Sequence, residues 1–188
     1  NNKIYAVQNS TVRFWDLRFF NTNNKKIIEI EKLFHPSFYL TNGKDSYEQF
    51  IENGYQANKI KNVEAIRYSE LMKYVNSSTT KNSKKNSVLI LGDYSIKSNL
   101  SISKSINKLG NDITKNFVFT VKEHPLRKMS NLLNIEFKKS NKHLKDLIES
   151  HEFAIVGNTT SAAVDLYLLG CKIIVIIDED FINFSPLK

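Results

Sequence analysis

The stretch FAIVGNTTSAAVDLYLLGCKIIVI, residues 153–176, decides the fold. It begins and ends with apolar runs that show no polar alternation, which is typical of strands buried on both faces. Between the runs, the segment GNTTS (157–161) opens a short helix-like stretch that closes at Gly170. The pattern predicts a strand, a helix and a second strand that lies parallel and close to the first.

The same alternation extends upstream to residue 87. The apolar runs SVLIL (87–91) and NFVFTV (116–121) predict two further strands, and isoleucines at 102 and 106 recur at helical spacing between them. SNKHLKDLIES (140–150) predicts another helix, with Ser140 as its N-cap. Residues 87–177 are therefore expected to form an α/β domain, a Rossmann-like parallel sheet with helices on both faces.

The first part of the chain has a weaker pattern. KIYAVQ (3–8) suggests a strand, and Asp45 with Glu48 has the spacing of a capping box at a helix start. The polar stretch NSSTTKNSKKN (76–86) is the best linker candidate, so we expect a partial N-terminal segment over residues 1–80 and a Rossmann-like domain over residues 81–188.

Composition narrows the class of protein. The chain has 188 residues, 41% of them hydrophobic, which suits one domain or one and a part. No run is apolar enough to span a bilayer, and the start lacks a signal peptide and an initiator Met, which suggests a fragment. The single Cys171 excludes an internal disulfide, and without a Cys/His cluster a structural zinc site is not expected.

The net charge of +8 suits an anionic partner such as nucleic acid, a membrane surface or a phosphorylated small molecule. Most of the excess is lysine scattered among asparagines, as in NTNNKK (21–26), which is typical of solvated loops. No nucleic-acid-binding motif accompanies the few arginines, so nucleic acid is not the expected partner.

Ligands of such folds bind outside the carboxyl ends of the strands, and three predicted strand ends carry polar residues there. At GNTTS, unpaired amides of a helix start and adjacent hydroxyls could cradle phosphate oxygens. The alternative is a plain N-cap, which explains one hydroxyl rather than three, while Asp165 in the same helix disfavours an anion. The candidate binding residues are Gly92, Asp93, Lys122, His124, Pro125, Gly157, Asn158, Thr159, Thr160 and Ser161.

His124 is the most specific of these candidates. Pro125 takes the chain out of the strand, so the imidazole is expected at the sheet edge, with Lys122 two residues before it. Both side chains could donate hydrogen bonds to a diphosphate and stabilise it as a leaving group. Arg13, in an aromatic-rich segment that we interpret as a packed connector, is a further candidate for contact with a ligand between domains.

The order of the motifs KEHP (122–125) and GNTTSAAVDLYLLGCKIIVI (157–176) resembles the donor-binding half of GT-B glycosyltransferases. In several bacterial sialyltransferase and glycerophosphotransferase-like families, a Lys-x-His-Pro strand end and a Ser/Thr pair at a helix start hold the nucleotide. STVRFWDLRFF (10–20), VEAIRYSEL (63–71) and NFSPLK (183–188) are similar to bacterial surface carbohydrate biosynthesis proteins. The chain departs from them at QNS (8–10), where related proteins often carry His and Gly.

The resemblance implies a bacterial glycosyltransferase of capsule or lipopolysaccharide biosynthesis. It would move a sugar from a nucleotide-activated donor to a glycan or lipid-linked glycan acceptor, with His124, Thr159, Thr160 and Ser161 on the phosphates. Residues 1–80 would be a connector and the end of the acceptor-side region, and residues 81–188 the donor domain of the C-terminal half. GT-B enzymes generally need no metal, so no metal or cofactor is expected, and the expected location is the cytoplasm, with at most peripheral association with the inner membrane face.

The sequence leaves the catalytic base unassigned. Asp16 and Asp93 are acidic residues near predicted loops, and we interpret both as structural. Two other functions stay open: a nucleotide-sugar epimerase on the same scaffold, which would require more carboxylates at strand ends, and a non-catalytic nucleotide- or polyanion-binding module.

Overall fold

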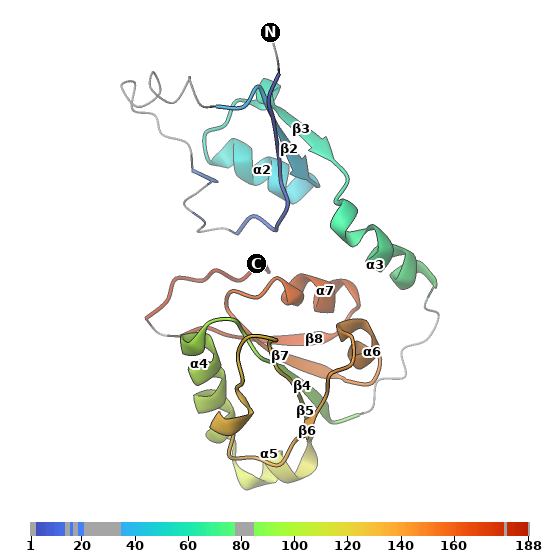
Figure 1. Cartoon of the computed structure of the whole chain (residues 1–188), viewed down its shortest axis with the longest axis vertical. Helices are drawn as coiled ribbons and strands as arrows, with labels where there is room; N and C mark the ends of the chain where they lie inside the picture. The colour runs from blue at the N-terminus through green and yellow to red at the C-terminus, as the bar shows by residue number, and fades with distance from the viewer. Residues whose placement is uncertain are drawn as a thin grey trace. The chain divides into compact units, whose positions relative to one another are not determined.

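The computed structural model describes residues 3–13, 16, 19–20, 35–77, 85–178 and 180–187 (Figure 1). The chain divides into two compact units, residues 1–69 and 70–188. This division falls inside helix α3 (Ile66–Ser77), whereas the boundary expected at residue 80 lies outside the described residues. Among the described residues, no helix combines the length and the apolar character that crossing a membrane requires.

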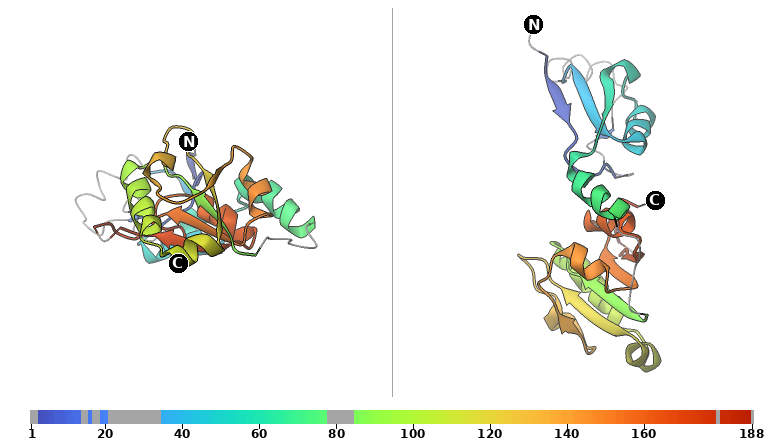
Figure 2. Two further views of the ribbon diagram at one scale, coloured as in Figure 1. Left: turned by 90° about the horizontal axis from the view of Figure 1, so that it is seen from below. Right: turned by 90° about the vertical axis from the view of Figure 1, so that its right-hand side faces the viewer.

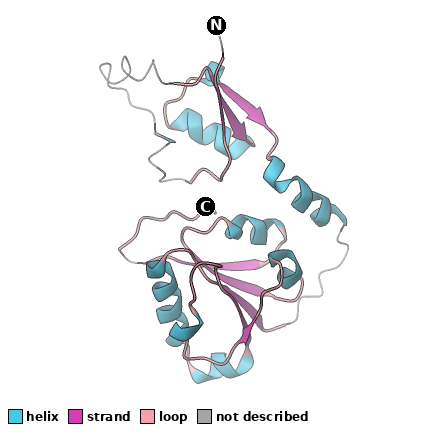
Figure 3. Cartoon of the chain, in the orientation of Figure 1, coloured by secondary structure: helices cyan, strands magenta, loops and turns pink. Residues whose placement is uncertain are grey.

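The larger unit is built on a five-stranded parallel sheet with the strand order β6-β5-β4-β7-β8 (Figure 1). The four strands and three helices predicted over residues 87–177 are present, and the structure adds three short elements, α5, η3 and β6, that were not predicted (Figure 3). In chain order, the elements are β4 (Ser87–Leu91), α4 (Ile96–Asn107), α5 (Asn111–Asn116), β5 (Val118–Lys122), the short 3-10 helix η3 (Ser130–Leu132), β6 (Lys138–Lys139), α6 (Leu144–Ile148), β7 (Phe153–Gly157), α7 (Ala162–Leu168) and β8 (Lys172–Ile176).

Two hydrophobic cores, one on each face of this sheet, explain why the strands show no polar alternation. On β4, Val88 and Ile90 pack with Ile102 and Ile106 of α4 in the first core. The alternate residues of β4 belong to the second core, which also holds Leu147 of α6 and Leu166 of α7. Figure 2 shows the larger sheet and its helices from two further directions. The predicted parallel sheet with helices on both faces is therefore confirmed.

The predicted parallel pairing of the strands on either side of the α7 helix is also confirmed. β7 and β8 pair in parallel, with Phe153 opposite Lys172 and Gly157 opposite Ile176. α7 joins them and packs against the sheet through Ala163 and Leu166, which are fully buried. The polar segment between β7 and α7 therefore lies at the carboxyl end of a central strand.

The smaller unit has its own parallel sheet, with the order β1-β2-β3. Phe50 and Ile60 form its core with aromatic side chains that include Tyr39 and Tyr55. The sequence indicated the first strand and the helix but missed the second and third strands. The elements are β1 (Tyr5–Val7), β2 (Phe38–Asn42), α2 (Lys44–Glu52), the 3-10 helix η2 (Ala57–Lys59) and β3 (Ile60–Val63).

Two predicted helix starts were wrong. α2 begins at Lys44 after Gly43, whose positive φ of 88° is a conformation that glycine adopts without strain, so Asp45 lies in the first turn and is not an N-cap. α6 begins after His143, because the Ser140 hydroxyl accepts from the Lys142 amide in the turn that precedes the helix.

Candidate functional site

A pocket of about 340 Å³ lies at the carboxyl ends of β4, β5 and β7, which are neighbours in the sheet. The fold thus brings together residues from three loops that are far apart in the sequence. Six of the predicted residues line the pocket, together with two that the sequence analysis missed, Tyr94 and Ser95. The predicted six are Gly92, Asp93, His124, Thr159, Thr160 and Ser161.

Asp93 is buried and ties the loops of the pocket together. Its carboxylate accepts hydrogen bonds from the Ser95 amide at 3.0 Å, the Ser98 hydroxyl at 3.0 Å and the Thr159 hydroxyl at 3.0 Å. Its backbone exchanges two hydrogen bonds with the Asn99 amide group, at 2.7 and 2.9 Å. The carboxylate therefore has a structural role, as its interpretation from sequence predicted, because these contacts occupy its oxygens.

Two glycines at these strand ends are required by close approach: Gly92, which lines the pocket, and Gly157, which does not. A Cβ atom at Gly157 would fall on the Ser98 hydroxyl and within 2.6 Å of Asp93 Oδ2. At Gly92 it would lie 2.9 Å from the backbone nitrogen of His124. Because real Cβ contacts are not this short, a side chain at Gly92 would push against the backbone that follows β5, and one at Gly157 would displace the side chains of Ser98 and Asp93.

His124 is half-buried and follows the end of β5. A four-residue turn fixes it: Pro125 is the second residue, and the Arg127 amide donates to the His124 carbonyl at 3.0 Å. Nδ1 accepts from the Leu126 amide at 3.2 Å, so the proton of the neutral imidazole is assigned to Nε2. Within the described part of the chain Nε2 has no hydrogen-bond partner, so His124 keeps one donor for a ligand.

Glu123 supports this turn from the other side of the strand end. Its Oε1 accepts from the amides of Met129 at 3.2 Å and Ser130 at 3.0 Å. Burial alone would raise the pKa of Glu123, but hydrogen bonds from Ser130, the charge of Lys139 and the Met129 amide together lower the pKa below its ordinary value of 4.5. The carboxylate is thus charged at neutral pH and anchors the segment after the His124 turn.

The three hydroxyls after β7 have different surroundings. Thr159 donates to Asp93, and the oxygen of Thr160 accepts from the Ala162 amide at 3.3 Å. The proton of the Thr160 hydroxyl has no acceptor among the described residues, so it can be donated to a ligand. Ser161 precedes α7 without forming a side-chain cap. The structure therefore shows no side-chain cap at the start of α7: the Thr159 hydroxyl has a structural bond, and the Thr160 oxygen accepts within the turn before the helix.

Four predicted binding residues of the larger unit do not line this pocket: Lys122, Pro125, Gly157 and Asn158. The Lys122 ammonium donates to the Lys142 carbonyl at 2.8 Å. The buried Asn158 holds the segment after β8, because its amide donates to the Ile182 carbonyl at 2.8 Å and its oxygen accepts from the Phe184 amide at 2.8 Å. The sequence did not reveal these contacts, because the partners are backbone groups at least 20 residues away along the chain.

Arg13 and Asp16 belong to the smaller unit. Arg13 Nε is buried there, and the Asp16 amide donates to the Arg13 carbonyl at 3.0 Å. Asp16 is buried, and the adjacent Phe19 packs on Phe50 with ring centroids 5.5 Å apart. These contacts belong to the unit's own core, which agrees with the interpretation of this segment as a packed connector.

The loop that departs from the related proteins, QNS (8–10), is held by Gln8. Its amide nitrogen donates to the Ser10 carbonyl at 2.7 Å and the Ser46 hydroxyl at 3.1 Å, and its oxygen accepts from the Asn42 amide at 2.7 Å. The glutamine thus joins β1, β2 and α2 at the carboxyl end of the smaller sheet.

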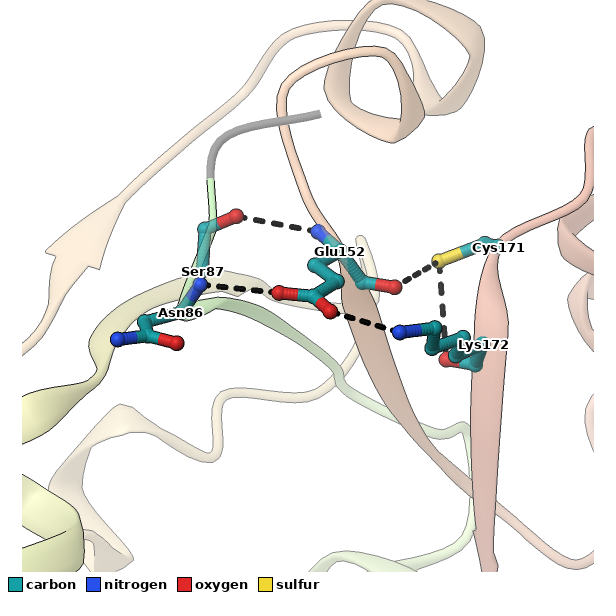
Figure 4. Close-up of polar contacts among 5 residues, drawn as sticks. All are labelled: Asn86, Ser87, Glu152, Cys171 and Lys172. Carbon is teal, nitrogen blue, oxygen red and sulfur yellow. Dashed lines mark hydrogen bonds and ion pairs between the residues drawn. The ribbon is translucent and has the colours of Figure 1, made fainter. Parts of the chain in front are cut away.

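The opposite, amino edge of the larger sheet carries a second polar cluster (Figure 4). Glu152 accepts from the Lys172 ammonium at 2.7 Å and the Asn86 amide at 3.0 Å, and its own amide donates to the Ser87 hydroxyl at 3.1 Å (Figure 4). The bond from Lys172, then that from the Asn86 amide, lowers the pKa of Glu152. Cys171 is half-buried beside this cluster (Figure 4).

No group of three or more metal-ligating side chains exists among the residues that the structure describes. The pocket instead offers hydrogen-bond donors, the His124 imidazole and the Thr160 hydroxyl, around a hollow at the carboxyl edge. Donors of this kind suit an oxygen-rich anion such as a phosphate or carboxylate.

No family model and no curated protein matches this sequence. Solved structures do match it. The UDP-N-acetylglucosamine 2-epimerase of Rickettsia bellii is similar over 91% of this chain, with 13% identity and a TM-score of 0.54. The UDP-GlcNAc 2-epimerase of Neisseria meningitidis, bound to UDP-GlcNAc, is similar over 90% of it, with 15% identity and a TM-score of 0.52. The chain spans 49% and 52% of those two chains. At these identities the likeness establishes the α/β, Rossmann-like fold.

Proposed function

We propose that this chain is the donor-binding part of an enzyme that acts on nucleotide sugars, and that the enzyme is a glycosyltransferase of bacterial surface polysaccharide biosynthesis. The observation that carries the proposal is the pocket at the carboxyl edge, which gathers His124 and the hydroxyl segment from separate loops. The fold, whose neighbours include a structure bound to UDP-GlcNAc, supports a nucleotide sugar as the ligand.

In this proposal the diphosphate of the donor lies in the pocket. His124 Nε2–H and the Thr160 hydroxyl donate hydrogen bonds to its oxygens, and the bonds strengthen as negative charge builds up on the leaving nucleotide. The glycosidic bond to the diphosphate breaks while a hydroxyl of a glycan or lipid-linked glycan acceptor bonds to the sugar carbon. The base that takes the acceptor's proton is not assigned.

A second candidate is a nucleotide-sugar epimerase, which the two similar structures favour by their names. Epimerisation moves a proton at a sugar carbon and therefore needs a general base near the sugar. Among the described residues, Asp93 is the only carboxylate that lines the pocket, and it already accepts three hydrogen bonds. Transfer also needs a base, for the acceptor hydroxyl, so the two candidates are separated by whether an acceptor receives the sugar.

Thermal shift measurements with CMP, UDP, GDP and CDP test the binding part of the proposal. A nucleotide that binds the folded chain raises its melting temperature in proportion to the logarithm of its concentration above Kd. If no nucleotide raises it, while nucleic acid binds with a steep salt dependence, the chain is a polyanion-binding module instead.

The reaction class is tested on the intact protein with the sugar nucleotide whose base gave the largest shift. A transferase releases the nucleoside diphosphate in a manner that depends on a glycan acceptor, and the sugar appears on that acceptor. Conversion of the sugar nucleotide to an isomer without any acceptor would instead establish the epimerase.

A further inference from the structure

Tyr94 is a large exposed side chain that lines the pocket and has no assigned role. It follows Asp93 after the end of β4, and 61% of its surface is exposed. Its hydroxyl has no hydrogen-bond partner among the described residues. A tyrosine in this position therefore contributes little to the core, and its ring and its hydroxyl are both accessible to a ligand.

The ring of Tyr94 is nevertheless held in place. Its centroid lies 5.7 Å from that of His124, with the ring planes at 75°, which is an edge-to-face contact. The guanidinium carbon of Arg127 lies 5.9 Å from the Tyr94 centroid, within the range of a cation–π contact. Both partners belong to the turn that fixes the His124 imidazole.

An exposed aromatic ring with a fixed orientation is a suitable surface for stacking a second planar ring. Fixing the ring beforehand lowers the entropy lost when a ligand binds. Any of the nucleobases can stack on such a side chain, because each base has a π-face. The ring lies beside the donors of His124 and Thr160, so one ligand with a planar ring and a diphosphate could use both features.

We propose that Tyr94 is a base-stacking residue of the nucleotide site, oriented by Arg127. This inference rests on the proposed nucleotide binding. It adds that the mouth of the pocket recognises the nucleobase of the ligand. Tyr94 contacts the nucleobase and His124 with Thr160 contacts the phosphates, so the two halves of the ligand are recognised by different residues.

Titration calorimetry with two probes, UDP and inorganic pyrophosphate, separates these halves. Tyr94→Ala should weaken UDP binding about tenfold to a hundredfold, because stacking on one aromatic side chain contributes a factor of this size. It should leave pyrophosphate binding unchanged. Tyr94→Phe, which keeps the ring, should bind UDP like the parent chain. Tyr167→Ala is the matched control, since Tyr167 is 64% exposed on α7 and does not line the pocket.

The role of Arg127 is tested by a double-mutant cycle. Arg127→Ala should weaken UDP binding in the parent chain but not in the Tyr94→Ala chain, because its effect passes through the ring. An equal loss in both backgrounds would overturn the positioning role and place Arg127 on the ligand itself.

The outcomes distinguish this inference from the proposed function. If the parent chain binds both probes and Tyr94→Ala binds UDP as tightly as the parent, or loses both probes equally, the stacking role is overturned and nucleotide binding stands. If the parent chain binds neither UDP nor pyrophosphate, the proposed function fails and the stacking role fails with it. Circular dichroism of each variant at the titration temperature confirms that it is folded.

Discussion

The two edges of the five-stranded sheet differ in what their polar residues do. At the amino edge, Glu152 is occupied by Lys172 and the Asn86 amide, so the charged groups there satisfy one another. At the carboxyl edge, His124 and Thr160 keep donors without partners among the described residues, and they border a hollow of about 340 Å³. Both edges thus carry polar residues at strand ends. Within the described part of the chain, the carboxyl edge differs from the amino edge because it keeps donors without partners around a hollow.

Among the substitutions that test this comparison, the largest effect on stability is expected at Gly157. Gly157→Ala should lower the free energy of unfolding by roughly 3 kcal/mol, because the new Cβ meets Ser98 and Asp93 and disrupts their hydrogen bond. Urea unfolding measures the change. Gly110→Ala, where a Cβ has open space and φ is −67°, is the control and should change stability by less than about 0.5 kcal/mol. Equal effects at the two glycines would contradict the close packing at the carboxyl edge.

The next effect is expected at Asp93. Asp93→Ala should cost about 2 kcal/mol, because it removes the buried carboxylate that accepts from the Ser95 amide and from the hydroxyls of Ser98 and Thr159. The exposed Asp112, in the first turn of α5, provides the control, and its replacement by Ala should be close to neutral. If Asp93→Ala kept full stability but lost nucleotide binding, Asp93 would be a ligand-binding residue and its structural assignment would be wrong.

The smallest effect is expected at the amino edge. The lowered pKa of Glu152 means that its charged form stabilises the fold above its unfolded pKa of about 4.5, and that this contribution disappears as the pH falls through the lower folded value. Glu152→Gln should therefore lower the melting temperature slightly at pH 7, and the difference from the parent should vanish at acidic pH. It should also shrink at high salt, because the pair is exposed. A difference that is independent of pH would refute this account.

The sequence was sufficient to predict four of the five strands of the larger unit, because these four read as uninterrupted apolar runs. It missed α5 and the short strand β6, whose residues Lys138 and Lys139 are exposed. The smaller unit was largely missed. Its strands Phe38–Asn42 and Ile60–Val63 are short and mix polar with apolar residues, so they lack that signal. The start of α6 was placed too early because Ser140, a good capping residue, forms a separate turn before the helix.

The candidate site was predicted in part. Residues that follow buried strands gather at one edge by topology, which is why Asp93, His124 and Thr160 could be placed together from sequence. Which of them keep free donors depends on long-range hydrogen bonds that no local pattern reveals, as with Lys122 and Asn158. Ser95 could have been found as the N-cap of α4, whereas no local signal marks an exposed tyrosine such as Tyr94 as a pocket residue.

The central claim is that the carboxyl edge binds the diphosphate of a nucleotide through His124. Calorimetric titration of UDP into the parent chain, His124→Ala and His143→Ala tests it directly, with His143 as an exposed histidine outside the pocket. We predict that His124→Ala weakens binding roughly tenfold to a hundredfold, as expected for the loss of one hydrogen bond to a charged group, and that His143→Ala binds like the parent. Equal affinities of the parent and His124→Ala would contradict the claim.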